Sequence, residues 1–190
     1  MRSSWISVAA MAASVAFAAE TATQDSCLAL ALNGGGAKGA YQAGVIHGFM
    51  HEGNPDDFQW DVVTGISGGA INTCAMAFWD KADGLAMSEW LSDEWVNLHT
   101  HDVWKLWPEG PITGLTGVSL LDDTPLLEFL TTTIKQFPDG LKRDSMVGTV
   151  NANNAAYQKW FFEQIPEEKR EELIPKACVS SASLPFLFQP

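Results

Sequence analysis

Two glycine-rich turns constrain the fold of this chain more than any other feature. The first covers residues 34–39 and the second covers residues 65–69, and each lies between an apolar run and a segment whose apolar residues have helical spacing. A strand–helix–strand–helix order predicts a parallel sheet with right-handed crossover connections. We therefore expect an α/β fold.

Apolar spacing predicts the other elements. We expect strands over 27–32, 60–64 and 146–150, and helices after each glycine turn, after the Asp122–Asp123 pair and over 163–173. The first helix carries a row of small residues, which should let it lie tightly against the sheet; they are Ala40, Gly44 and Gly48.

Residues 80–117 show a looser, irregular pattern that contains four tryptophans. A long irregular segment of this kind is often a lid or binding loop, but large rings are as often buried in a core. Both interpretations stay open for the four residues Trp90, Trp95, Trp104 and Trp107.

The second glycine turn has the pattern G-x-S-x-G, formed by Gly65, Ser67 and Gly69. Where a strand leads into such a turn and a helix leaves it, the serine hydroxyl is held out above the sheet as a nucleophile. The helix dipole would also stabilise negative charge that develops on the serine. Ser67 is therefore the candidate nucleophile of an acyl hydrolase.

The first glycine turn could serve either of two functions. Its backbone N–H groups could form an oxyanion hole beside the serine, but Gly34, Gly36 and Gly39 also match the dinucleotide pattern G-x-G-x-x-G. A dinucleotide site needs an acidic residue at the end of the second strand, where this chain has the Ser67 turn instead. The hydrolase is favoured, and a nucleotide-binding Rossmann-like module is the weaker alternative.

The two turns resemble those of the patatin-like phospholipases. In that family a D-G-G-G-x-[RK]-G loop precedes a G-x-S-x-G turn; here residues 33–39 read N-G-G-G-A-K-G, with Asn33 in place of the usual aspartate. Residues 177–186 resemble the family's A-S-x-A-x-P segment. The resemblance implies a three-layer α/β/α fold with a mainly parallel sheet, incomplete at its C-terminus. It also implies that Ser67 is the nucleophile and that the glycine loop forms the oxyanion hole, through Gly34, Gly35, Gly36, Lys38 and Gly39.

The resemblance does not assign the catalytic base. In the family the base is an aspartate in a D-G-[GA] motif that follows the A-S-x-A-x-P segment. The Asp-Gly pairs here begin at Asp83 and Asp139, and both precede that segment and continue with leucine. The catalytic aspartate is therefore left unassigned, and we expect the 190-residue chain to be nearly inactive on esters and a longer form to be active.

Residues 1–19 have the layout of a secretory signal peptide. A single positive charge precedes a short apolar stretch that ends in an A-x-A site at residues 16–18. This leaves residues 20–190 as one patatin-like phospholipase domain and predicts secretion or a secretory-pathway lumen. The net charge of −12 argues against nucleic acid and against strong electrostatic docking on anionic lipid. The expected partner is a lipid or phospholipid substrate, met through transient contact with a membrane surface.

No cofactor or metal is expected. Cys27, Cys74 and Cys178 lack metal-ligand spacing, and the first two are interpreted as small buried apolar residues. His99 and His101 lack a third ligand at a useful spacing, and no loop resembles an EF-hand. A histidine base is also disfavoured, because none of the histidines fits the Ser, Asp, His order of α/β-hydrolases.

Two functional hypotheses of different class remain. The first is a lipid acyl hydrolase of the phospholipase or esterase type. The second is a catalytically inactive lipid-binding protein that retains an acyl groove.

Overall fold

A computed structural model describes residues 27–108 and 119–188 of the chain. Four strands form one mixed sheet in the order β1-β2-β3-β4. The pairs β1/β2 and β2/β3 are parallel, and the pair β3/β4 is antiparallel. The strands are β1 (Ala29–Leu32), β2 (Val62–Gly65), β3 (Asp144–Val150) and β4 (Tyr157–Phe161). The predicted signal peptide lies outside the described residues.

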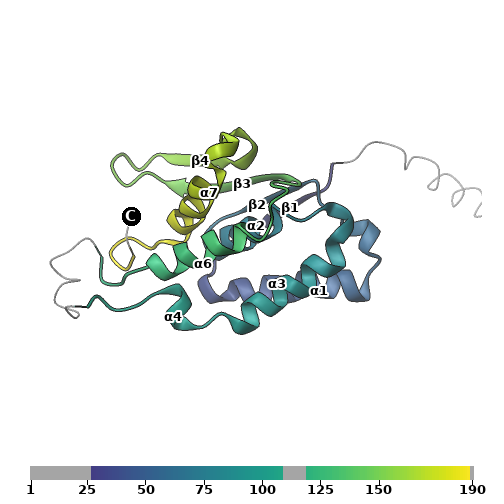
Figure 1. The fold of residues 1–190 in the computed structure, drawn as a ribbon, viewed down its shortest axis with the longest axis horizontal. Helices are drawn as coiled ribbons and strands as arrows, with labels where there is room; N and C mark the ends of the chain where they lie inside the picture. Colours follow the sequence, from purple (N-terminus) through teal and green to yellow (C-terminus); the bar gives the residue numbers. More distant parts are fainter. Residues whose placement is uncertain (1–26, 109–118, 189–190) are drawn as a thin grey trace, which may run out of the picture.

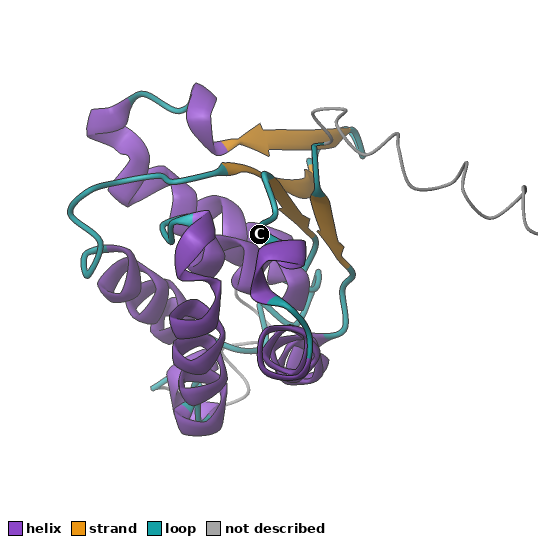
Figure 2. Ribbon diagram, turned by 90° about the vertical axis from the view of Figure 1, so that its right-hand side faces the viewer, coloured by secondary structure: helices purple, strands orange, loops and turns teal. Residues whose placement is uncertain are grey.

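Helices flank this sheet (Figures 1 and 2). In chain order they are η1 (Gly36–Lys38), α1 (Gly39–Glu52), η2 (Pro55–Phe58), α2 (Gly68–Met76), η3 (Lys81–Asp83), α3 (Gly84–Asn97), α4 (Thr100–Val103), α6 (Thr124–Ile134), η4 (Phe162–Gln164) and α7 (Glu167–Ala182). The predicted α/β class and the mainly parallel sheet are confirmed. The β1–α1–β2–α2 order is the one that the two glycine turns predict.

The strand register places large apolar side chains of three strands on one buried face of the sheet. Leu32 pairs with Gly65, which pairs in turn with Val147, so the partners share one face of the sheet. Val63 lies two residues from Gly65 and therefore points to the same face. Leu32, Val63 and Val147 are all buried there.

The small-residue row of α1 does not pack as the sequence analysis predicts. A Cβ atom at Gly44 or Gly48 would have no heavy atom within 4 Å, so neither glycine approaches another backbone. The helix is held instead by Ala43, Ile46 and Met50, which are spaced three and four residues apart and are buried. The prediction was wrong because small size permits close packing but does not require it.

The segment after residue 80 is more regular than predicted. Helix α3 buries Met87, Ser88 and Leu91, a helical spacing that the sequence analysis missed among the tryptophans. Trp90 packs with its ring centroid 5.6 Å from that of Trp79 and 5.5 Å from that of Phe137. The core-packing interpretation therefore holds for Trp90, whereas residues 109–118 lie outside the described part.

Two further expectations need correction. Cys27 is exposed rather than buried, although Cys74 is fully buried as predicted. Strand β4 was not predicted, because its sequence Y-Q-K-W-F is not strongly apolar and its pairing with β3 depends on tertiary contact.

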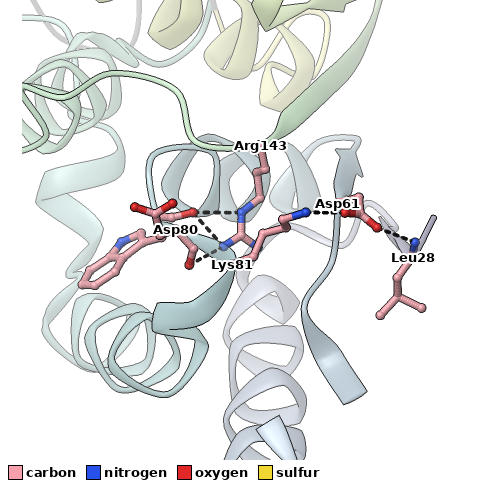
Figure 3. Close-up of polar contacts among 6 residues, drawn as sticks. Leu28, Asp61, Asp80, Lys81 and Arg143 are labelled. Carbon is pink, nitrogen blue, oxygen red and sulfur yellow. Dashed lines mark hydrogen bonds and ion pairs between the residues drawn. The ribbon is translucent and has the colours of Figure 1, made fainter. Parts of the chain in front are cut away.

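A polar network joins the loop after α2 to the starts of three strands (Figure 3). The buried guanidinium of Arg143 donates from Nε and Nη2 to the Trp79 carbonyl, at 3.1 and 2.8 Å, and from Nη2 to the Asp80 carbonyl at 3.1 Å. Nearby, Lys81 pairs with Asp61, whose other carboxylate oxygen accepts the Leu28 N–H at 2.8 Å. Burial lowers the pKa of Arg143 to about 10, so the group stays charged at neutral pH.

We expect replacement of Arg143 by methionine to destabilise the fold by about 1.5–3 kcal/mol, because the Trp79 and Asp80 carbonyls lose hydrogen bonds to a buried charged donor. Urea denaturation of Arg143→Met measures the loss. The matched control is Lys142→Met, whose side chain is 30% exposed and forms a looser pair with Asp80; it should change stability by less than about 1 kcal/mol. Equal losses of stability in Arg143→Met and Lys142→Met would contradict a specific contribution of the Arg143 hydrogen bonds.

Candidate active site

Ser67 occupies a strained position between a strand and a helix. It lies between the end of β2 and the start of α2, with φ 56° and ψ −124°. A positive φ is uncommon for a residue with a side chain, and such strain is concentrated at functional sites. The strand–turn–helix context predicted around Ser67 is therefore present in the structure.

The glycines on either side of Ser67 are required by close backbone contacts. A Cβ atom at Gly65 would collide with the backbone of Gly69, and one at Gly69 would collide with the Leu32 carbonyl. Any larger residue would push α2 away from the end of β1. The G-x-S-x-G pattern is thus a steric requirement of this turn.

The glycine loop lies directly against the serine turn. A Cβ atom at Gly34 would sit 3.1 Å from the Cβ of Ser67, and one at Gly68 would sit 2.5 Å from the Gly36 carbonyl oxygen. Gly36 and Ala37 open η1 and Gly68 opens α2. N–H groups in the first turn of a helix have no partner within that helix. The two turns can therefore offer backbone donors from both sides of Ser67.

Ser181 on α7 supports the serine turn from behind. Its hydroxyl accepts the Ser67 N–H at 2.9 Å and donates to the Gly148 carbonyl on β3 at 2.6 Å. One side chain thus links the strained residue to the sheet. This role was not predicted from the sequence, where its signal was the serine-rich end of the A-S-x-A-x-P-like segment.

A second network supports the glycine loop. The indole N–H of Trp95 donates to the fully buried side chain of Asn72 at 2.6 Å. The Asn72 amide donates to the Gly39 carbonyl and to the Gln42 side chain, each at 3.0 Å. Gln42 donates in turn to the Asn33 carbonyl at 2.7 Å. The loop is therefore held at both ends by helices α1, α2 and α3.

The glycine loop and Ser67 open into one cavity of about 750 Å³. This size is within the usual range for small-molecule sites. Most of its wall is apolar, and the wall consists of Gly35, Gly36, Ala37, Ala40, Ser67, Gly68, Ile71, Trp95, Leu98, His99, Thr100, Val103, Trp104, Asp123, Leu126, Ala182, Ser183, Leu184 and Phe188. Segments far apart in the sequence meet there.

The predicted site residues fall into three groups. Gly35, Gly36 and Ser67 are on the cavity wall. Gly65 and Gly69 lie behind it in close backbone contacts, and Gly34 and Gly39 lie against the side chains of Ser67 and Trp95. The side chain of Lys38 is exposed.

Of the other titratable candidates, few reach the cavity. His99 lies on the wall, whereas Asp83 and Asp139 do not. Asp123 and Ser183 also lie on the wall and were missed as site residues, because the Asp122–Asp123 pair was interpreted only as a helix start. That helix start is confirmed at α6.

Within residues 27–108 and 119–188, no cluster of three or more His, Cys, Asp or Glu side chains has a metal-binding arrangement. None of the helices in this same part of the chain combines the length and apolarity needed to cross a bilayer.

A comparison with protein families gives a match over most of the chain. A protein-family model described as "Patatin-like phospholipase" matches residues 30–190. A similar solved structure is VipD from Legionella pneumophila, with 15% sequence identity and a TM-score of 0.46. The alignment covers 86% of this chain and 43% of VipD, so this chain spans less than half of that protein. No curated protein sequence matches.

Replacement by alanine should lower the stability of the fold at a glycine in close contact and should not lower it at a glycine in open space. We expect Gly68→Ala to destabilise the fold by about 1–3 kcal/mol, because its Cβ would press on the Gly36 carbonyl. The control Gly44→Ala lies in open space within a helix and should stabilise by about 0.5–1 kcal/mol. Thermal denaturation of both variants measures the difference, and a stable Gly68→Ala would refute the close contact.

Removal of the Ser181 hydroxyl should loosen the serine turn. Ser181→Ala leaves the Ser67 N–H and the Gly148 carbonyl without their partner, at an expected cost of about 1–3 kcal/mol. Hydrogen exchange of the Ser67 amide should become faster. The exposed neighbour in Ser180→Ala is the control and should leave both readouts unchanged.

Proposed function

The chain belongs to the patatin-like phospholipase family, and on that premise we propose that it is a lipid acyl hydrolase with Ser67 as nucleophile. The observation that carries the proposal is the strained Ser67 turn with the glycine loop against it. Strain of this kind is expected where a hydroxyl must be presented to substrate. The family's lipid-hydrolysing character supports the same reaction class.

The proposed reaction is two-step acyl transfer. The Ser67 hydroxyl oxygen attacks the ester carbonyl carbon while its proton passes to a carboxylate base. Backbone N–H groups of the glycine loop and of Gly68 stabilise the oxyanion. The base then protonates the departing alcohol, and a water molecule cleaves the acyl-enzyme, which restores the serine and releases the fatty acid.

The carboxylate base is not assigned to a residue. Within the described ranges, no hydrogen bond involves the Ser67 hydroxyl, and neither Asp83 nor Asp139 reaches the cavity wall. The family resemblance places the base in a D-G-[GA] motif. We therefore propose that a form of the protein with that motif carries full activity.

The shape and lining of the cavity support a lipid ester as substrate. Its volume of about 750 Å³ and its apolar wall suit an acyl chain. Leu184 lies at the wall, and Leu184 and Phe186 are 56% and 85% exposed. Exposed apolar residues of this kind favour contact with a lipid surface, so we assign this segment to the transient membrane contact.

One observation favours the alternative of an inactive lipid-binding protein. A serine without a hydrogen-bonded base is a weak nucleophile, and the Ser67 hydroxyl has no such partner among the residues described. The alternative retains the cavity but predicts no covalent chemistry at Ser67.

We also propose that the mature protein begins near residue 20 after removal of a signal peptide. The intact mass of protein recovered from an exporting host tests this. A mass that retains residues 1–19 would contradict it.

A fluorophosphonate probe should label the chain covalently at Ser67, and Ser67→Ala should abolish labelling. The probe mimics the tetrahedral intermediate, and its phosphorus is more electrophilic than an ester carbonyl. Ser67 should therefore be labelled, although slowly, even while turnover of esters needs the unassigned carboxylate base. Peptide mass spectrometry locates the adduct. The controls are Ser180→Ala and Ser92→Ala, which should keep wild-type labelling; wild-type protein that is not labelled would favour the lipid-binding alternative.

A further inference from the structure

Asp123 is a buried carboxylate on the wall of the Ser67 cavity. Its residue surface is only 6% exposed. It occupies the N-cap position of α6 but makes no capping hydrogen bond. The neighbouring Asp122 accepts instead, from the Thr124 N–H at 2.9 Å and the Thr124 hydroxyl at 2.5 Å. The helix start therefore does not account for the Asp123 side chain.

Few hydrogen-bond donors surround the carboxylate of Asp123. The Ser183 hydroxyl lies 2.8 Å from the carboxylate oxygen Oδ2 of Asp123 and also 2.8 Å from the Val179 carbonyl. A hydroxyl has one proton and can donate to only one of these acceptors at a time. Asp123 therefore has at most one shared donor among the described residues, although a carboxylate can accept about four hydrogen bonds.

Asp123 also lacks a cation. The nearby Lys105 pairs with Asp122 at 3.4 Å, and no ion pair within the described ranges includes Asp123. Burial of a carboxylate without a counter-ion is costly. A ligand that brings a positive charge and N–H donors into the cavity could pair with the unused lone pairs of this carboxylate.

The rest of the wall favours a cation as well. Trp95 and Trp104 line the same cavity, and the faces of tryptophan rings attract cations. The chain's net charge of −12 also disfavours an anionic headgroup. We infer that Asp123 is a specificity residue that binds the ammonium group of a zwitterionic phospholipid headgroup such as ethanolamine. This inference rests on the proposed function, since it assumes that the cavity holds a phospholipid.

A structural role is the competing explanation. The contact between Asp123 and Ser183 ties the start of α6 to the end of α7. A tie of that kind would affect stability and would weaken all ligands alike. A headgroup site would affect only ligands with an ammonium group.

The test compares two soluble amphiphiles of equal chain length below their micelle concentrations, an alkylphosphoethanolamine and an alkylphosphoglycerol. Isothermal titration with the 190-residue chain measures each dissociation constant. We expect Asp123→Asn to weaken ethanolamine binding about tenfold or more and to change glycerol binding less than about twofold. The control Glu128→Gln removes the same charge from the exposed face of α6 and should change neither.

The outcomes separate the inference from the proposed function. Equal weakening of both ligands, or a wild type without preference for ethanolamine, overturns the inference. The inference is also overturned if the preference for ethanolamine persists in Asp123→Asn but disappears in Ser183→Ala, because Ser183→Ala leaves the Asp123 carboxylate in place. Labelling of Ser67 without ethanolamine binding overturns the inference alone. Ethanolamine binding that depends on Asp123, without labelling of Ser67, supports the inference and overturns only the catalytic proposal. Absence of both the binding and the labelling overturns the inference and the catalytic proposal together.

Discussion

The structure depends on one contact, the approach of the first glycine turn to the second. A side chain at Gly68 would collide with the Gly36 carbonyl, and one at Gly34 would press against Ser67. Because each turn follows a strand of the same parallel pair, both emerge at one edge of the sheet. That arrangement puts the hydroxyl of Ser67, whose backbone is strained, and backbone N–H groups without a helical partner beside one cavity. The chemistry we propose needs both.

Side-chain hydrogen bonds hold this contact in place from three directions. Ser181 joins the Ser67 turn to β3, and Asn72 joins the glycine loop to α2 and α3 through Gln42 and Trp95. Arg143 secures the far end of α2 by binding the Trp79 and Asp80 carbonyls. Each partner is buried or partly buried, where an unmade hydrogen bond is costly. The site is therefore built on a rigid scaffold.

The sequence predicted the parts of the fold that depend on local patterns. The two glycine turns, the first two strand–helix units and the position of Ser67 follow from spacing and turn chemistry, and the structure has them. The spacing of Met87 and Leu91 also indicates helix α3, but this helical spacing was missed among the neighbouring tryptophans. Strand β4 and the placement of Gly44 and Gly48 could not be read, because they depend on which neighbours the fold brings near.

The supporting residues of the site were not predictable for the same reason. Asp123 and Ser183 are 60 residues apart and meet only after α6 and α7 pack, and Ser181 acts on a residue 114 positions away. In the sequence these residues look like a helix cap and a serine-rich helix end. Their roles appear only with tertiary contact.

A structure of the chain after reaction with a fluorophosphonate would test the central claim most directly. The account predicts a phosphorus–oxygen bond to Ser67, with the phosphonyl oxygen about 2.7–3.1 Å from backbone nitrogens of the glycine loop and of Gly68. An adduct on another residue, or a phosphonyl oxygen that points away from both turns, would contradict the account.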